Sequence, residues 1–247
     1  MLRQINFSKK DRLIIAGDYI DRGVQNFEML KWIENCPNNI ILLRGNHDEE
    51  FAYCIDLLKV IIKKSNRKAH SYEDTVTAYA MMKELADKKI KQMAPFDYYG
   101  TIGQLILEHS VCMEQLERWS SCIRNMSFVF KDYIAGKNCV VVHAGYIENL
   151  DCAETEDHFD SVEDFYLYAR DDAYICGGIE HGIVVAGHTP TWMSDELPYN
   201  EGNIYRSYDE ELDCVFYDVD CGCAYRGKVP DAKLACIRLE DEKIFYI

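Results

Sequence analysis

The sequence has few basic residues and no long apolar run. Among its 247 residues, 27 are Lys or Arg and 42 are Asp or Glu, which gives a formal net charge of −15. This deficit of positive charge argues against a nucleic-acid-binding protein, because such proteins present a basic surface to the phosphate backbone. No segment approaches the roughly 18–20 consecutive apolar residues that a membrane span needs. We therefore expect neither a nucleic-acid partner nor a membrane-embedded protein.

Proline and glycine are also scarce, with 5 and 14 residues, while 48% of the chain is hydrophobic. This composition excludes disordered and collagen-like chains and predicts one globular domain over residues 1–247. The first twelve residues lack the apolar core of a secretory signal. The eleven cysteines are therefore expected to be reduced thiols, and the predicted location is the cytoplasm.

Short aliphatic runs predict the strands, and the first four are continuous enough to suit strands buried on both faces. These runs are Leu13–Ala16, Ile40–Leu43, Cys139–Val142, Ile183–Ala186, Val215–Val219, Leu234–Leu239 and Lys243–Ile247. Between the first two, Val24–Asn35 has helical spacing and is closed by Pro37. The beginning of the chain is thus predicted to be a βαβ unit.

The middle of the chain, from about Glu49 to Asp132, has apolar residues at every third or fourth position. It is predicted to be a helical insertion, with its clearest helices over Tyr72–Met93 and Leu105–Trp119. The part after Asn203 alternates between apolar and polar residues and is predicted to form antiparallel strands. Together these segments indicate an α/β fold with a helical insertion.

Each of the first four predicted strands ends in a polar cluster, and the clusters read GDYIDRG, RGNHDE, HAGY and GHTP. Ligands of α/β proteins bind where strands end, and strands of one sheet would bring the four clusters together. Carboxylate, amide and imidazole groups without a thiolate form a ligand set that suits Mn, Fe or Zn. The clusters therefore predict a metal and phosphate site.

In this order the four motifs resemble those of the calcineurin-like metallophosphoesterases. The resemblance is to the branch of the family that includes the Ser/Thr phosphoprotein phosphatases and the bacterial diadenosine tetraphosphatases. The segment DCGCAYRGKVPDAKLACIRLED resembles the closing strand pair of the family, so the resemblance covers nearly the whole chain. It implies an αββα sandwich with a dinuclear metal centre at one edge.

The resemblance also implies the metal ligands. Asp18 resembles the aspartate that bridges both metals, and Asn46, His143 and His188 resemble the other ligands of the second metal. A carboxylate is a natural bridge, because it offers two oxygens and a negative charge. Two neighbouring cations can lower the pKa of a shared water and direct the resulting hydroxide at phosphorus.

The remaining roles concern the proton and the phosphate. His47 resembles the general acid that protonates the leaving oxygen, and Asp21 resembles the carboxylate that orients it. Histidine titrates close to neutral pH, and a carboxylate partner fixes its tautomer. Arg22 resembles a phosphate clamp, and Arg170 matches a second clamp on a looser pattern. The planar fork of arginine fits phosphate oxygens.

One motif of the family is missing from this sequence. The first strand of the family ends in Asp-x-His-Gly, which supplies two ligands to the first metal, and no such motif occurs here. We therefore expect the first strand and half of the first helix of the family to be absent, and we explain this by a mis-assigned start codon or a truncated gene model. Because two metal ligands are missing, we expect a mononuclear centre and weak activity. Asp218 and Asp220 are expected to be turn or capping residues rather than replacement ligands.

The resemblance implies hydrolysis of phosphomonoesters by a metal-activated hydroxide, with Mn²⁺ as the expected metal and Fe or Zn as alternatives. Phosphoserine and phosphothreonine side chains of proteins are the first expectation for the substrate. Pro190 stands where nuclease-type relatives carry a second histidine, which favours the phosphatase branch. Two alternatives stay open: a dinucleoside-polyphosphate hydrolase that acts on a small phosphoester, and a degenerate member that binds phosphorylated ligands without turnover. The oligomeric state is not predicted.

Overall fold

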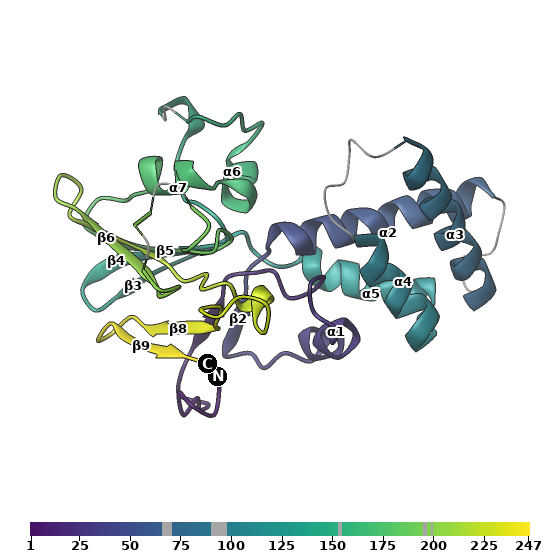
Figure 1. Ribbon diagram of the computed structural model, residues 1–247, viewed down its shortest axis with the longest axis horizontal. Helices are drawn as coiled ribbons and strands as arrows, with labels where there is room; N and C mark the ends of the chain where they lie inside the picture. Colours follow the sequence, from purple (N-terminus) through teal and green to yellow (C-terminus); the bar gives the residue numbers. More distant parts are fainter. Residues whose placement is uncertain (66–70, 90–97, 153–154, 195–196, 199) are drawn as a thin grey trace. The chain divides into compact units, whose positions relative to one another are not determined.

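The computed structural model describes residues 1–65, 71–89, 98–152, 155–194, 197–198 and 200–247 (Figure 1). The chain divides into two compact units. The first, the sheet unit, contains Met1–Gly17, Asn38–Gly45 and Ser127–Ile247. The second, the helical unit, contains Asp18–Pro37 and Asn46–Met126.

The sheet unit contains a five-stranded sheet in the order β3-β4-β5-β7-β6. Its strands are β3 Val129–Ile134, β4 Lys137–Val142, β5 Gly182–Ala186, β6 Tyr205–Asp209 and β7 Cys214–Asp218. The three central strands β4, β5 and β7 pair in parallel, and the outer strands β3 and β6 are antiparallel to their neighbours. The carboxyl ends of β4 and β5 consequently lie side by side, which brings the residues that follow them together.

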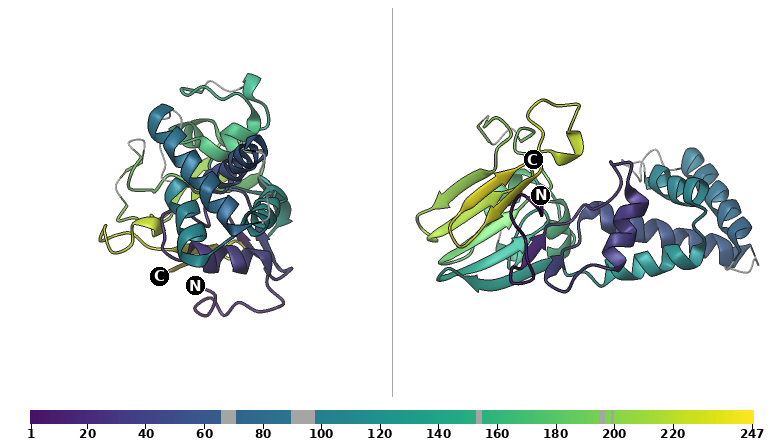
Figure 2. Two further views of the ribbon diagram at one scale, coloured as in Figure 1. Left: turned by 90° about the vertical axis from the view of Figure 1, so that its right-hand side faces the viewer. Right: turned by 90° about the horizontal axis from the view of Figure 1, so that it is seen from below.

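Two smaller ladders accompany this sheet. Strands β1 (Leu13–Ile15) and β2 (Ile40–Leu42) pair in parallel, with Ile14 opposite Ile41. Strands β8 (Ala235–Arg238) and β9 (Lys243–Tyr246) form an antiparallel hairpin. The hairpin lies against the five-stranded sheet (Figure 2).

The five-stranded sheet is apolar on both faces. On one face, buried side chains such as Val141 and Val185 pack against side chains of the two small ladders, including Ile14 and Ile237. This is a sheet-on-sheet core. On the other face, Val140, Val184 and their neighbours pack against aromatic side chains of two short helices and of strand β6. Those helices are α6 Val162–Tyr168 and α7 Asp171–Cys176, and the unit also has the 3₁₀ turns η1 Leu150–Cys152 and η2 Cys223–Tyr225.

The helical unit contains α1 Asn26–Glu34, α2 Asn46–Lys64, α3 Tyr72–Lys89, α4 Tyr98–His109 and α5 Met113–Arg124. Helix α2 contacts α3, α4 and α5, and α1 contacts α4 and α5. Side chains at helical spacing, such as Phe51, Ile55 and Leu58 of α2, are completely buried. The unit is therefore held together by the apolar stripes that its spacing predicts. None of the described helices is long and apolar enough to cross a membrane.

The predicted α/β class is confirmed, as are the parallel pairing of β1 with β2 and the helix α1 between them in the chain. All seven predicted strands are present, and β3 and β6 are additional. The expectation that the first four strands share one sheet is wrong, because β1 and β2 form a separate ladder. These two strands are only partly buried over most of their length, since a two-stranded ladder uses one face for the core.

The prediction of one helix over Leu105–Trp119 is also wrong, because α4 ends at His109 and α5 begins at Met113. Ser110 takes a left-handed conformation with φ 54°, and the amide of Val111 donates to the carbonyl of Leu105. A left-handed residue of this kind is a common helix terminator that periodicity does not reveal. The end of the predicted helix Tyr72–Met93 lies outside the described residues, and the helical stretch ends before β3 rather than at Asp132.

Candidate metal and phosphate site

Two glycines of the sheet unit touch each other just after strands β1 and β2. A Cβ atom on Gly17 would lie 2.6 Å from the amide nitrogen of Gly45 and 2.8 Å from Nδ1 of His143. Gly17 also has φ +95°, so only glycine fits this position without strain. The ends of β1, β2 and β4 therefore meet at one point. Asp18 and Asn46 are the residues that follow the two glycines in the chain.

The two predicted histidine ligands lie together within the sheet unit, at the ends of β4 and β5. Nδ1 of His143 is 2.6 Å from the carbonyl oxygen of Ala16. A carbonyl can only accept, so Nδ1 carries the hydrogen, and in this tautomer Nε2 is the nitrogen that can accept a hydrogen bond or bind a metal. Nε2 lies 3.1 Å from Nδ1 of His188, with the two rings edge to face. In metal-binding histidines the nitrogen that does not bind the metal typically donates a hydrogen bond that orients the ring, as Nδ1 of His143 does to Ala16.

The loop that carries His188 is fixed by backbone hydrogen bonds. The amide of Gly187 donates to the carbonyl of His143, and the amide of Thr191 donates to that of Asp220. His188 itself has φ 72°, a conformation that costs a non-glycine residue about 1–2 kcal/mol. Strained residues of this type concentrate at functional sites. The surrounding loop thus holds His188 in one orientation.

Arg170 immediately precedes helix α7, and its side chain is exposed. Its Nη1 donates to Oγ1 of Thr189 at 3.3 Å. The predicted second phosphate clamp therefore lies next to His188 within the sheet unit. Arg22, the predicted first clamp, is an exposed residue of the helical unit.

In the helical unit, the start of helix α2 positions Asp18. The backbone amide of His47 donates to Oδ1 of Asp18 at 3.2 Å. The carboxylate of Asp48 accepts hydrogen bonds from the backbone amide of Asp18, at 2.8 Å, and from that of Tyr19, at 3.2 Å. Asn46, the predicted amide ligand, is almost fully buried at the first position of the helix. A carboxylate at a helix N-terminus is favoured by the helix dipole.

His47 and Asp21 form a hydrogen-bonded pair in the helical unit. Nδ1 of His47 is 2.9 Å from Oδ2 of Asp21, and the hydroxyl of Thr101 donates to Oδ1 of Asp21 at 2.8 Å. Burial lowers the pKa of His47, but the hydrogen bond to Asp21 and the charge of Asp18 outweigh burial, so that this pKa is raised. Burial raises the pKa of Asp21, but the hydrogen bonds from His47 and Thr101 leave it lowered. The pair therefore favours a protonated imidazole beside an ionised carboxylate.

Two residues of the site were missed in the sequence analysis. Asp48 is fully buried and holds the backbone around Asp18, and it lies inside the GNHD motif, where it could have been noticed. Thr101 lies in helix α4, far along the chain, and no local pattern connects it with Asp21. Asp218 and Asp220 behave as expected for turn residues, since each accepts a backbone amide two residues further on.

The donor set fits a divalent cation on its chemistry. The imidazole pair of His143 and His188 offers two nitrogens to one point, and Asp18 and Asn46 offer oxygens. No thiolate is included, which suits the harder transition metals.

Comparison with known proteins agrees with this chemistry. The profile of the calcineurin-like phosphoesterases matches residues 1–223. A symmetrical bis(5'-nucleosyl)-tetraphosphatase of Marinomonas sp. (strain MWYL1) is 43% identical over 49 residues, which are 19% of this chain and 18% of that protein. The same enzyme of Chromobacterium violaceum is 39% identical over 49 residues, with the same coverage. The matched segment thus spans about a fifth of the length of these curated relatives.

A crystal structure described provisionally as that of a diadenosine tetraphosphatase is 15% identical, with a TM-score of 0.49 over all of this chain and 84% of that one. The family is one of metal-dependent phosphoesterases. With its profile matching nearly the whole length, the chain belongs to the calcineurin-like phosphoesterase family.

Proposed function

We propose that this protein is a metal-dependent phosphoesterase that holds one divalent cation, Mn²⁺ for preference, through Asp18, Asn46, His143 and His188. The observation that carries the proposal is the fixed imidazole pair of His143 and His188, whose facing nitrogens are 3.1 Å apart. Further support comes from the close approach of Gly17 and Gly45 beside His143. Asp18 and Asn46 are the residues that follow these two glycines in the chain.

When bound, the cation would supply Lewis-acid chemistry, which lowers the pKa of water and polarises a phosphoryl oxygen. His47 donates a proton to the leaving oxygen, because its pKa is raised and it is protonated over a wider pH range. Asp21 holds Nδ1 of His47, so that the proton on Nε2 is the one available for transfer. Arg22 and Arg170 bind the phosphate oxygens.

For the substrate, the proposal favours dinucleoside polyphosphates. Its support is the 49-residue match to two enzymes named symmetrical bis(5'-nucleosyl)-tetraphosphatases. Phosphoserine and phosphothreonine, the first expectation from the sequence, stay a prediction without specific support. Both substrate classes present a phosphoryl group to the same residues.

The test is hydrolysis by the purified chain in the presence of MnCl₂, with p-nitrophenyl phosphate, diadenosine tetraphosphate and a phosphothreonine peptide as substrates. The proposal expects ADP from diadenosine tetraphosphate, and a loss of activity of about 10²–10⁴-fold in His47→Ala. His158→Ala is the control, because His158 is an exposed histidine that forms an ion pair with Asp160 on the surface of the sheet unit. Phosphate released from the peptide alone would favour the phosphoprotein class, and binding without turnover would indicate a degenerate member.

A further inference from the structure

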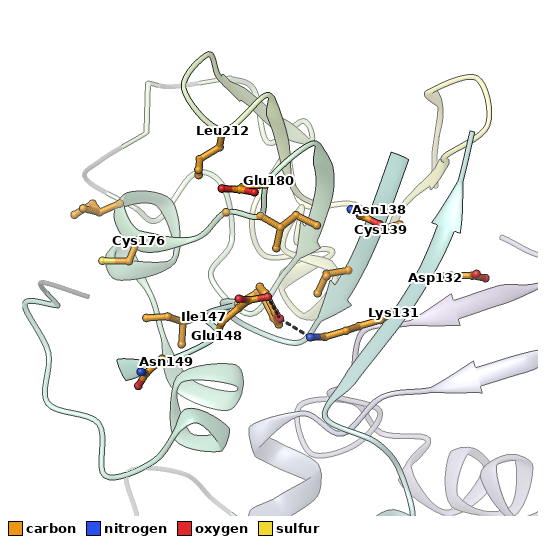
Figure 3. A pocket seen from close by; sticks show the side chains of 15 residues that line it. Lys131, Asp132, Asn138, Cys139, Ile147, Glu148, Asn149, Cys176, Glu180 and Leu212 are labelled. Carbon is orange, nitrogen blue, oxygen red and sulfur yellow. Dashed lines mark hydrogen bonds between the residues drawn. The ribbon is translucent and has the colours of Figure 1, made fainter. Parts of the chain in front are cut away.

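A groove of about 940 Å³ lies within the sheet unit (Figure 3). Its lining includes Asn138 at the start of β4 and Glu180, two residues before β5. His143 and His188 instead follow the opposite ends of these two strands. The lining also reaches the loop after β4, where Tyr146 and Ile147 are three and four residues beyond His143, but neither His143 nor His188 is among the lining residues. A ligand in this groove leaves the histidine pair accessible.

The groove is lined by aliphatic side chains from three separate segments. Ile175 and Ile179 come from α7 and the segment after it, Ile147 from the loop that follows β4, and Leu212 from the turn between β6 and β7. Ile175 is 56% exposed, which is unusual for an isoleucine in this fold. A Cβ on Gly178 would lie 2.7 Å from Cδ1 of Leu212, so glycine lets the two walls approach closely. The lining offers an apolar surface, and an apolar group that covers it gains free energy because apolar surface is removed from water.

The rim of the groove is acidic. Glu148 and Glu180 are exposed lining residues, and Figure 3 places Glu180 beside Leu212 and Glu148 beside Lys131. The β6–β7 turn around Leu212 adds the carboxylates of Asp209, Glu210 and Glu211, while Asp213 is already paired with Lys137 and His181.

Among the described residues one lysine, Lys131, lines the groove, and it is already engaged. Nζ of Lys131 donates to the hydroxyl of Tyr146 and lies 4.8 Å from the centre of that ring. The hydroxyl of Tyr146 in turn donates to Oε1 of Glu148 at 3.4 Å. Asp132, another lining residue, pairs with Arg12. Carboxylates therefore outnumber the cations around the groove.

We propose that this groove binds a short extended segment of a partner protein in which Lys or Arg residues flank an aliphatic side chain. The cationic groups pair with the rim carboxylates, and the aliphatic group covers Ile175, Ile179 and Leu212. The acidic rim repels nucleotides and other phosphates. A free polyamine supplies the charge but no branched apolar group, so it leaves the aliphatic lining uncovered. The segment thus tethers its protein to the phosphoesterase without occupying the histidine pair.

The probe is a fluorescein-labelled peptide, Gly-Arg-Lys-Ile-Arg-Leu-Gly, titrated with the full chain by fluorescence anisotropy. The first control peptide replaces Ile and Leu by Ser, and the second replaces Arg and Lys by Glu. We expect micromolar binding of the probe, and binding at least tenfold weaker for both control peptides. Glu180→Lys and Ile175→Asp each weaken probe binding at least tenfold. Both side chains are exposed, and unchanged circular dichroism shows that the variants fold.

Matched controls carry the same changes elsewhere. Glu240→Lys alters an exposed turn between β8 and β9, and Val60→Asp alters a 46% exposed position of α2, so neither changes probe binding. The proposal is overturned if the serine peptide binds within twofold of the probe or if spermidine displaces the probe at equal concentration. Equal losses in the control variants, or no binding up to about 1 mM, overturn it as well.

Discussion

The Nδ1 atom of His143 lies 2.6 Å from the carbonyl oxygen of Ala16, two residues before Asp18. This bond fixes the tautomer of His143 and directs Nε2 toward His188. It also ties the end of β4 to the end of β1, which belong to different ladders of the sheet unit. A single hydrogen bond thus connects the packing of the two ladders with the orientation of the nitrogen that we propose as a metal ligand.

The first prediction concerns the close approach at Gly17. Gly17→Ala adds a Cβ within 2.6–2.8 Å of Gly45 and His143 at a φ of +95°, so both strain and overpacking apply. We expect a loss of about 2–4 kcal/mol in the free energy of unfolding, measured in urea, together with weaker metal binding.

Gly136 provides the matched control for this experiment. It also has a positive φ, of +86°, but an added Cβ would meet nothing within 4 Å. Gly136→Ala should therefore cost only the conformational strain, about 1–2 kcal/mol, and leave metal binding unchanged. Equal losses in the two variants would show that the contact of Gly17 with Gly45 and His143 is unimportant.

The second prediction concerns the partner of His47. In the native protein the carboxylate of Asp21 holds Nδ1 of His47 and raises the pKa of that histidine. Asp21→Asn removes this charge. We expect kcat for p-nitrophenyl phosphate to fall by about 10–100-fold, by analogy with outer partners of other site histidines.

Thr101→Val separates positioning from charge. It removes the hydroxyl that donates to Asp21 but keeps both members of the pair. The lost bond donates to an ionised carboxylate and is worth about 1.5–3 kcal/mol; because both members of the pair remain, we expect kcat to decrease by no more than about tenfold. An unchanged kcat in Asp21→Asn would contradict the assigned role of this carboxylate.

Much of the fold could be predicted from sequence patterns. The aliphatic runs of β4, β5 and β7 are found as strands because parallel, buried strands leave a continuous apolar pattern. Strands β3 and β6 were not predicted individually, because they are edge strands whose exposed positions carry Lys131, Tyr133 and Arg206. Such alternation is weak evidence without knowledge of the neighbouring strand.

The site was predictable to the extent that it is encoded in local motifs. His143 and His188 were identified because each lies within two residues of the end of a strand, and the structure brings their rings together. Thr101 could not be found, since its contact with Asp21 spans 80 residues and depends on the packing of helix α4. The break at Ser110 was missed because it is a backbone conformation that hydrophobic spacing does not encode.

The third prediction concerns a buried carboxyl group of the sheet unit. Burial, and then the charge of Asp220, raise the pKa of Asp218 well above its ordinary value of 3.8, although Tyr174 donates to it at 2.6 Å. A raised carboxyl pKa stabilises the fold while the group is protonated. That stability is lost as the pH rises from the unfolded value of 3.8 toward the higher folded value.

Asp218→Asn removes this ionisation. The Tm of the variant, relative to that of the wild type, should therefore increase between pH 4.5 and pH 7.5, by about 2–4 °C for each kcal/mol relieved. Measurement of both proteins by calorimetry across this range checks the expectation. A Tm difference that does not change with pH would mean that Asp218 is ionised in the folded protein throughout.

The central claim is that the imidazole pair holds a divalent cation. Titration of the metal-free chain with MnCl₂, followed by isothermal calorimetry, tests it directly. The account predicts one bound ion per chain and an affinity at least 100-fold lower in His143→Ala and in His188→Ala, by comparison with the 10–100-fold cost of losing only an outer partner. His181→Ala, at an exposed histidine that contacts Asp213, should bind as the wild type does. Unchanged affinity in both His143→Ala and His188→Ala would contradict the account.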